Sequence, residues 1–67
     1  MEAYTEYFVD VNNESGFVRQ LEVFQTYEEA VKFTADYNEP LNKNEYLNII
    51  FVDYNENGDE IAFGSVV

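Results

Sequence analysis

Residues 26–38 carry the sequence TYEEAVKFTADYN, which decides the fold because it is the one segment with convincing helical periodicity. Thr26 is a suitable N-cap, and Glu29 three residues later completes a capping box. Apolar and aromatic side chains recur on one side and charged ones on the other, as in an amphipathic helix packed against a sheet. Asn38 can end this helix, and Pro40 prevents its continuation.

Extended segments flank the helix, two before it and two after it. Aromatic and β-branched residues predict strands, and polar clusters containing glycine predict the turns between them. The predicted strands cover residues 4–11, 17–24, 46–54 and 59–66, with turns at 12–16 and 55–58 and a polar connection at 39–45. We therefore expect one small α+β domain over residues 1–67, with a hairpin at 4–24, a helix at 26–38 and a hairpin at 46–66.

The strand order follows from the position of the helix between the second and third strands. A right-handed crossover makes those two strands parallel in direction. Placing the first strand between them gives the order 2-1-3-4, a ββαββ fold with an antiparallel sheet and the helix on one face. The order 1-2-3-4, with a parallel central pair, is the alternative.

The two hairpins resemble each other in sequence. FVDVNNESG at 8–16 aligns with FVDYNENG at 51–58 when one extra residue is allowed in the first turn. Either the chain contains an internal duplication, or two hairpins use the same turn residues independently.

The third predicted strand is apolar on both of its faces, which is typical of a strand covered on both sides. One helix covers only one face of a sheet, so the second face needs another subunit, a partner or a ligand. We therefore expect a homodimer. The candidate interface consists of Phe8, Leu47, Ile49 and Phe51.

The composition is aromatic and strongly acidic. Six Tyr and six Phe supply the buried area that a chain of 67 residues otherwise lacks. Fourteen acidic residues against three basic ones give a net charge of −11, which disfavours nucleic-acid and membrane binding and favours a basic protein surface. The hydrophobic content of 46% argues against disorder. Without a long apolar run or a signal-peptide pattern, the sequence favours a cytoplasmic protein.

Residues suited to catalysis are scarce. The chain has no His and no Cys, which removes the commonest general base, Ser–His nucleophiles and the usual thiolate or imidazole metal sites. Adjacent carboxylates here are more typical of a solvated surface than of a glycosidase cleft. We therefore expect no enzymatic activity and no cofactor.

The residues at 53–58, DYNENG, match the opening of an EF-hand calcium loop. The position of the bidentate Glu falls on Gly64, and the flanking segments are predicted strands, so Asn57 and Gly58 more simply predict a hairpin turn. A weak Ca²⁺ site is the alternative. Its ligands would be Asp53, Asn55, Asn57 and Asp59.

These features favour a non-enzymatic protein that presents carboxylates to a basic partner. The candidate residues are Glu28, Glu29, Asp36, Glu56, Asp59 and Glu60. In general character alone, the chain resembles the small acidic phage-encoded inhibitors of host defence systems, which suggests a mimic of nucleic-acid phosphates. No motif identifies a specific family. The alternatives are a small-molecule-binding or sequestering oligomer with an aromatic-lined interface site, a structural or accessory subunit, and acidity that only keeps a small dimer soluble.

Overall fold

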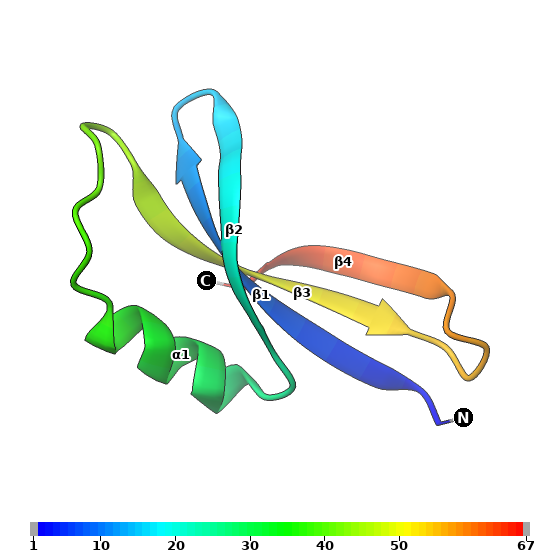
Figure 1. Cartoon of the computed structure of the whole chain (residues 1–67). Helices are drawn as coiled ribbons and strands as arrows, with labels where there is room; N and C mark the ends of the chain where they lie inside the picture. The colour runs from blue at the N-terminus through cyan, green and yellow to red at the C-terminus, as the bar shows by residue number, and fades with distance from the viewer. Residues whose placement is uncertain (1, 67) are drawn as a thin grey trace.

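The computed structural model describes residues 2–66 as one four-stranded sheet with one helix (Figure 1). The element order is ββαββ, as predicted. The elements are β1 (Tyr4–Asn13), β2 (Gly16–Phe24), α1 (Tyr27–Asp36), β3 (Tyr46–Tyr54) and β4 (Glu60–Val66). The α+β class is therefore confirmed.

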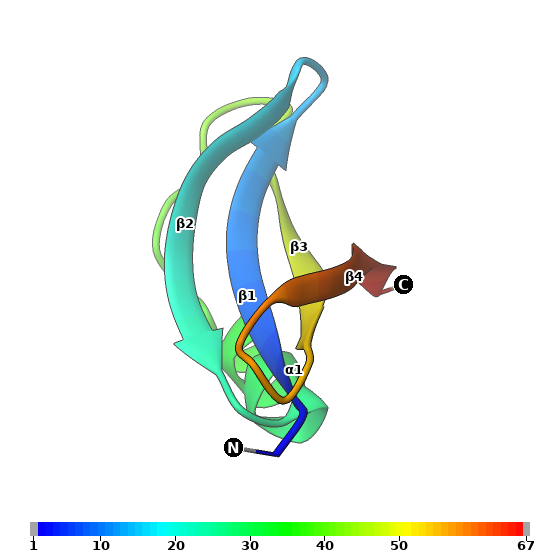
Figure 2. The same ribbon diagram turned by 90° about the vertical axis from the view of Figure 1, so that its right-hand side faces the viewer.

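The strands are arranged in the order β2-β1-β3-β4, and every neighbouring pair is antiparallel. This is the predicted order 2-1-3-4, because α1 carries the chain past β1 to its far side. The strands are strongly twisted, and β4 crosses the direction of β1 and β2 steeply (Figure 2). The register of β1 and β3 runs from Tyr4 opposite Tyr54 to Asn12 opposite Tyr46.

Several boundaries differ from the prediction. Strand β1 continues to Asn13 and β2 begins at Gly16, because residues predicted as turn pair with each other across the hairpin. Asn13 Oδ1 accepts a hydrogen bond from the Ser15 N–H at 2.8 Å, and Gly16 takes the positive φ of 116° that closes the turn. Strand β4 begins one residue late, at Glu60.

The helix begins as predicted and ends early. Thr26 Oγ1 accepts from the Glu29 N–H at 3.2 Å, which satisfies one donor of the first turn. The Thr26 hydroxyl also lies 3.0 Å from Glu29 Oε1. The helix ends at Asp36, because Tyr37 is already extended with ψ of 124°. Asn38, the predicted end, lies in the connection to β3.

Helix α1 covers one face of the sheet. The Tyr27 ring lies 6.0 Å from the Tyr7 ring, and Phe33 lies 5.5 Å from Phe24. Because the register places Tyr7 opposite both Phe24 and Phe51, these residues mark the covered face. This covered face and the helix contribute the fully buried residues. They are Val9, Val11 and Ala30.

Candidate functional site

The opposite face of the sheet, called the open face below, is not covered by α1. Alternation along β1 places Tyr4, Glu6, Phe8, Asp10 and Asn12 on it. The residues directly opposite them on β3 are Tyr54, Val52, Ile50, Asn48 and Tyr46. On β4, Phe63 is opposite Val52 and Ser65 is opposite Ile50. The open face therefore combines apolar rows with a polar region near Asp10.

The predicted homodimer interface does not form one surface. Phe8 is opposite Ile50 on the open face, whereas Leu47, Ile49 and Phe51 are opposite Val11, Val9 and Tyr7 on the covered face. The FVD stretches at 8–10 and 51–53 suggested equivalent positions, but the two strands pair with an offset that places Phe8 and Phe51 on opposite faces. Grouping these four residues was therefore wrong, and the homodimer itself stays a prediction.

Charge is distributed unevenly between the two ends of the sheet. The end where Tyr4 pairs with Tyr54 lies beside the β3–β4 turn, at the right of Figure 1. Its charged residues are all acidic in the described chain, and they form what we call the acidic end. They are Glu2, Glu6, Asp53, Glu56, Asp59 and Glu60. Arg19, opposite Val11, and Lys43, just before β3, lie towards the other end.

The six predicted partner-binding acids are only partly brought together. Glu56, Asp59 and Glu60 lie in or beside the β3–β4 turn, at the acidic end. The first turn of α1 holds Glu28 and Glu29, and Glu28 lines a depression of about 610 Å³ with Tyr4 and Glu6. Asp36 is separate, since it ends the helix and accepts from Lys32 Nζ at 3.1 Å.

Glu2, Glu6 and Asp53 belong to the acidic end but were not among the predicted partner-binding acids, and Asp53 was predicted only as a possible Ca²⁺ ligand. Glu2 and Glu6 come next to the β3–β4 acids only through the pairing of β1 with β3, so the predicted strand order was the signal that could have found them. Asp53 lies in β3 just before the turn. Thr5 Oγ1 donates to Asp53 Oδ1 at 2.6 Å, and the rings of Tyr4 and Tyr54 stack with centroids 4.7 Å apart. The pKa of the Tyr54 hydroxyl is raised above its ordinary value, first by desolvation and then by the negative charges of Glu6 and Glu60. This shift is consistent with surroundings that are uniformly negative.

Asp10 is the one buried charged residue of the described chain, with 8% of its surface exposed. Its Oδ1 atom, like that of Asn12, is shielded from solvent and has no hydrogen-bond partner within residues 2–66. Asn48, opposite Asp10, accepts from Ser65 Oγ at 2.9 Å through its own Oδ1. Desolvation raises the pKa of the Asp10 carboxyl above its ordinary value. Sequence pattern alone gave no signal for this burial.

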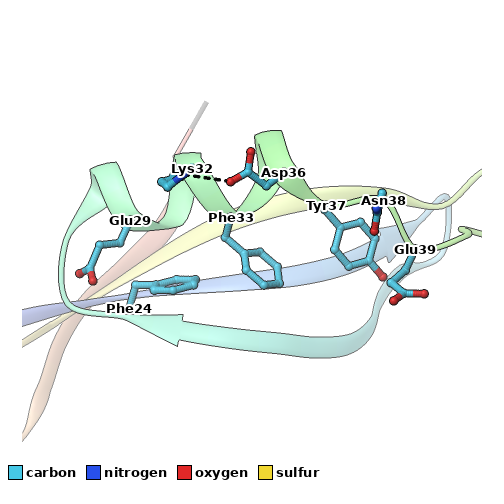
Figure 3. Close-up of a pocket in the computed structure, with 8 residues that line it drawn as sticks. All are labelled: Phe24, Glu29, Lys32, Phe33, Asp36, Tyr37, Asn38 and Glu39. Carbon is cyan, nitrogen blue, oxygen red and sulfur yellow. Dashed lines mark hydrogen bonds and ion pairs between the residues drawn. The ribbon is translucent and has the colours of Figure 1, made fainter.

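An aromatic groove of about 550 Å³ lies between α1 and the end of β2 (Figure 3). Phe24, Phe33 and Tyr37 line it, and their rings follow one another with centroid distances of 5.5 Å and 5.8 Å. The rings are surrounded by the carboxylates of Glu29, Asp36 and Glu39. Lys32 donates a hydrogen bond to the Asp36 carboxylate.

Asn55, Asn57 and Asp59 of the calcium hypothesis lie in a hydrogen-bonded turn, and Asp53 lies near the end of β3. Asn55 Oδ1 accepts from the backbone N–H of Asn57 at 2.9 Å and of Asp59 at 3.0 Å. Asp53 Oδ1 accepts from the Thr5 hydroxyl, as described above, and the Asn55 N–H donates to the Asp59 carbonyl at 2.9 Å. Residues 2–66 contain no group of three or more His, Cys, Asp or Glu side chains arranged to hold a metal ion.

Comparison with known proteins gives no family for this chain. No family model, no curated protein and no solved structure matches it. Among residues 2–66, no helix has both the length and the apolar character of a membrane span. Functional inference therefore depends on the surfaces described above.

Proposed function

We propose that this protein is a non-enzymatic interaction protein that presents the carboxylates of its acidic end to a partner with a basic surface. The observation that carries the proposal is the uniform sign of charge where β1, β3 and the β3–β4 turn meet. Carboxylates without neighbouring cations produce a field that accelerates association with a basic protein. Arg19 is bonded to Glu45 and Lys32 to Asp36, away from the acidic end.

In its sharper form, the acidic end mimics nucleic-acid phosphates and occupies the binding site of a nucleic-acid-binding enzyme. A net charge of −11 on 67 residues supports this form and disfavours direct binding of DNA or RNA. Under this proposal the protein acts in the cytoplasm as an inhibitor of the phage-encoded type. Binding through exposed carboxylates should weaken at high salt, because salt screens exposed charges. An accessory subunit that docks through apolar contacts should instead stay bound at high salt.

The test is capture of host proteins on three immobilised versions of the chain. The acidic-end variant combines Glu56→Gln, Asp59→Asn and Glu60→Gln. A matched control neutralises three exposed carboxylates elsewhere through Glu14→Gln, Glu22→Gln and Glu39→Gln. We expect wild type and control to capture a nucleic-acid-binding protein that salt releases and duplex DNA displaces, and we expect the acidic-end variant to lose it. Equal capture by the acidic-end variant, or no captured protein at all, contradicts the proposal.

A second candidate function is binding of a small organic cation, and the aromatic groove favours it. Phe24, Phe33 and Tyr37 offer ring faces, and the surrounding carboxylates favour positive charge. Choline and its neutral analogue 3,3-dimethylbutanol provide a matched test by thermal unfolding. Choline should raise the melting temperature of wild type and fail to do so in Phe33→Leu. An equal shift with the neutral analogue rejects this function.

A further inference from the structure

We infer that the open face is a docking surface for a partner protein, on which a partner arginine donates hydrogen bonds to Asp10 and Asn12. The inference rests on the proposed function, because it identifies a specific contact made by the basic partner. It concerns a different part of the molecule, since the acidic end lies at one end of the sheet and Asp10 lies near its middle.

Two neighbouring acceptors on the open face lack donors in the described structure. Asp10 and Asn12 are separated by one residue on β1, so their side chains leave the same face about 7 Å apart along the strand. Each has a solvent-shielded Oδ1 without a partner in the described structure. Buried polar atoms in folded proteins almost always have hydrogen-bond partners, and an ionised one without them costs considerable stability. A donor from outside the chain would satisfy both.

The donor chemistry favours arginine. A guanidinium carries five N–H donors in a rigid planar fork, which can serve two separated acceptors and retains its charge when partly dehydrated. A lysine ammonium is a more strongly hydrated point charge and spans such a pair less well. Asp10 keeps 8% of its surface exposed, and its cross-strand neighbour Gln20 is exposed.

The surroundings of Asp10 provide apolar contacts for the rest of the partner. Phe8 and Ile50 are half-buried beside Asp10, and Phe63 on β4 is 72% exposed. In protein interfaces, an arginine contributes most to binding when surrounding apolar contacts exclude water from it. The open face would surround a bound arginine in this way. The open face therefore provides both the charge and the apolar area that such a partner needs.

A second copy of this chain is a poor occupant of the open face. Two-fold packing of this face on itself would bring Asp10 of each copy into one interface. Glu6, which lies on the same face of β1, would enter that interface as well. Burying like charges together is unfavourable, and the chain has only three basic residues with which to compensate them. Charge complementarity therefore selects a cationic partner over self-association.

The test uses Nα-acetyl-arginine amide as the probe, followed by NMR on the full chain. Nα-acetyl-citrulline amide is the matched neutral control, because it replaces the guanidinium with an uncharged group of similar shape. We expect the arginine probe to shift the side-chain amide signals of Asn12 and Asn48 in a saturable manner. We expect Asp10→Asn to weaken this binding about tenfold, since it removes a charged acceptor. Asp59→Asn, at the acidic end, should leave it unchanged.

The outcomes separate this inference from the proposed function. Arginine-dependent shifts that centre on the β3–β4 turn and persist in Asp10→Asn overturn the docking site, while the proposed function of the acidic end stands. Equal shifts with the citrulline probe, or no shift at Asn12 and Asn48, also overturn it. Open-face signals that move with protein concentration alone identify a second copy as the occupant and reject the arginine. Weaker capture of the partner by both the acidic-end variant and Asp10→Asn supports the docking site. Loss of capture in the acidic-end variant alone, with full capture by Asp10→Asn, overturns the docking site and leaves the proposed function standing.

Discussion

The two faces of this sheet are built on the same strands and differ most in chemistry along the middle of β1. On the covered face, Val9 and Val11 are fully buried. On the open face, their neighbours Asp10 and Asn12 hold buried oxygen atoms without partners in the described chain. Alternation along a strand explains why adjacent residues have such different surroundings. The comparison indicates that the covered face supplies stability, whereas the open face gives up some stability to retain polar groups.

The largest expected change in stability comes from introducing a carboxylate on the covered face, where it would be fully buried, in place of the carboxylate that the open face tolerates. Val9→Asp should destabilise the protein by about 4 kcal/mol or more, because Val9 is fully buried and an unpaired charge there has no donor. Urea unfolding followed by circular dichroism measures the change, with Val9→Ala as the control for lost volume alone. If Val9→Asp costs no more than Val9→Ala, the two faces do not differ as described.

The reverse change concerns Asp10. Asp10→Asn should stabilise the free protein by about 1 kcal/mol at pH 7, because it removes a buried charge and adds a donor next to Asn12. It should also weaken binding of the arginine probe, so stability and binding should change in opposite directions. Loss of stability in urea unfolding at pH 7 would contradict the assignment of Asp10 as an unpartnered charge.

The stability gain of Asp10→Asn should depend on pH. Burial raises the pKa of the folded Asp10 carboxyl above 3.8, so the unfolded chain releases this proton first as the pH rises. The Asp10 carboxyl therefore lowers the stability of wild type progressively between pH 3.8 and the higher folded pKa, and Asp10→Asn lacks this contribution. The charge-related gain should be absent below pH 3.8 and complete above the folded pKa. Urea unfolding across this range checks the sign, and a gain largest at acid pH would contradict it.

The cap of α1, the helix that distinguishes the two faces, has an expected effect of about the same size as Asp10→Asn and of opposite sign. Thr26→Ala should destabilise the protein by about 1 kcal/mol, because it removes the hydroxyl that accepts from the Glu29 N–H. Thr26→Ser keeps that acceptor and should change stability by only a few tenths of this amount. Thermal unfolding of both variants measures the difference. Equal stability of the Ala and Ser variants would show that the cap does not hold the helix on the sheet.

The smallest expected effect is at the exposed ion pair of α1. Lys32→Gln should cost about 0.3 kcal/mol at low salt and almost nothing at high salt, because both side chains are well exposed. Thermal unfolding in the two salt conditions measures it. A loss of more than about 1 kcal/mol would contradict this expectation, because the exposed side of α1 would then contribute strongly to stability beside the buried covered face.

Sequence reasoning predicted the elements and their order because periodicity, the Thr26 cap and turn residues act locally. It failed where the answer depended on register. Phe8 and Phe51 occupy matching FVD stretches, yet Phe8 pairs with Ile50 and lies on the opposite face from Phe51. An offset of one residue exchanges the faces, and the letters alone do not determine it.

The acidic end and the buried carboxylate were hidden for different reasons. Glu6 and Asp53 are far apart in sequence and come to the same end only through pairing of β1 with β3. Asp10 belongs to a residue type that is almost always exposed, so its burial depends on the neighbouring strands and could not be inferred from its identity. Glu56, Asp59 and Glu60 were accessible to prediction because one short turn brings them together.

The central claim is that the open face holds a carboxylate that has no partner until another protein supplies one. The most direct test is an NMR titration of the Asp10 side-chain carboxyl in the free protein and with saturating Nα-acetyl-arginine amide. We expect a pKa of the Asp10 carboxyl above 3.8 in the free protein, and a lower pKa when the guanidinium is bound. A pKa at or below 3.8 in the free protein, unchanged by the probe, would contradict it, because the carboxylate would already be stabilised within the chain.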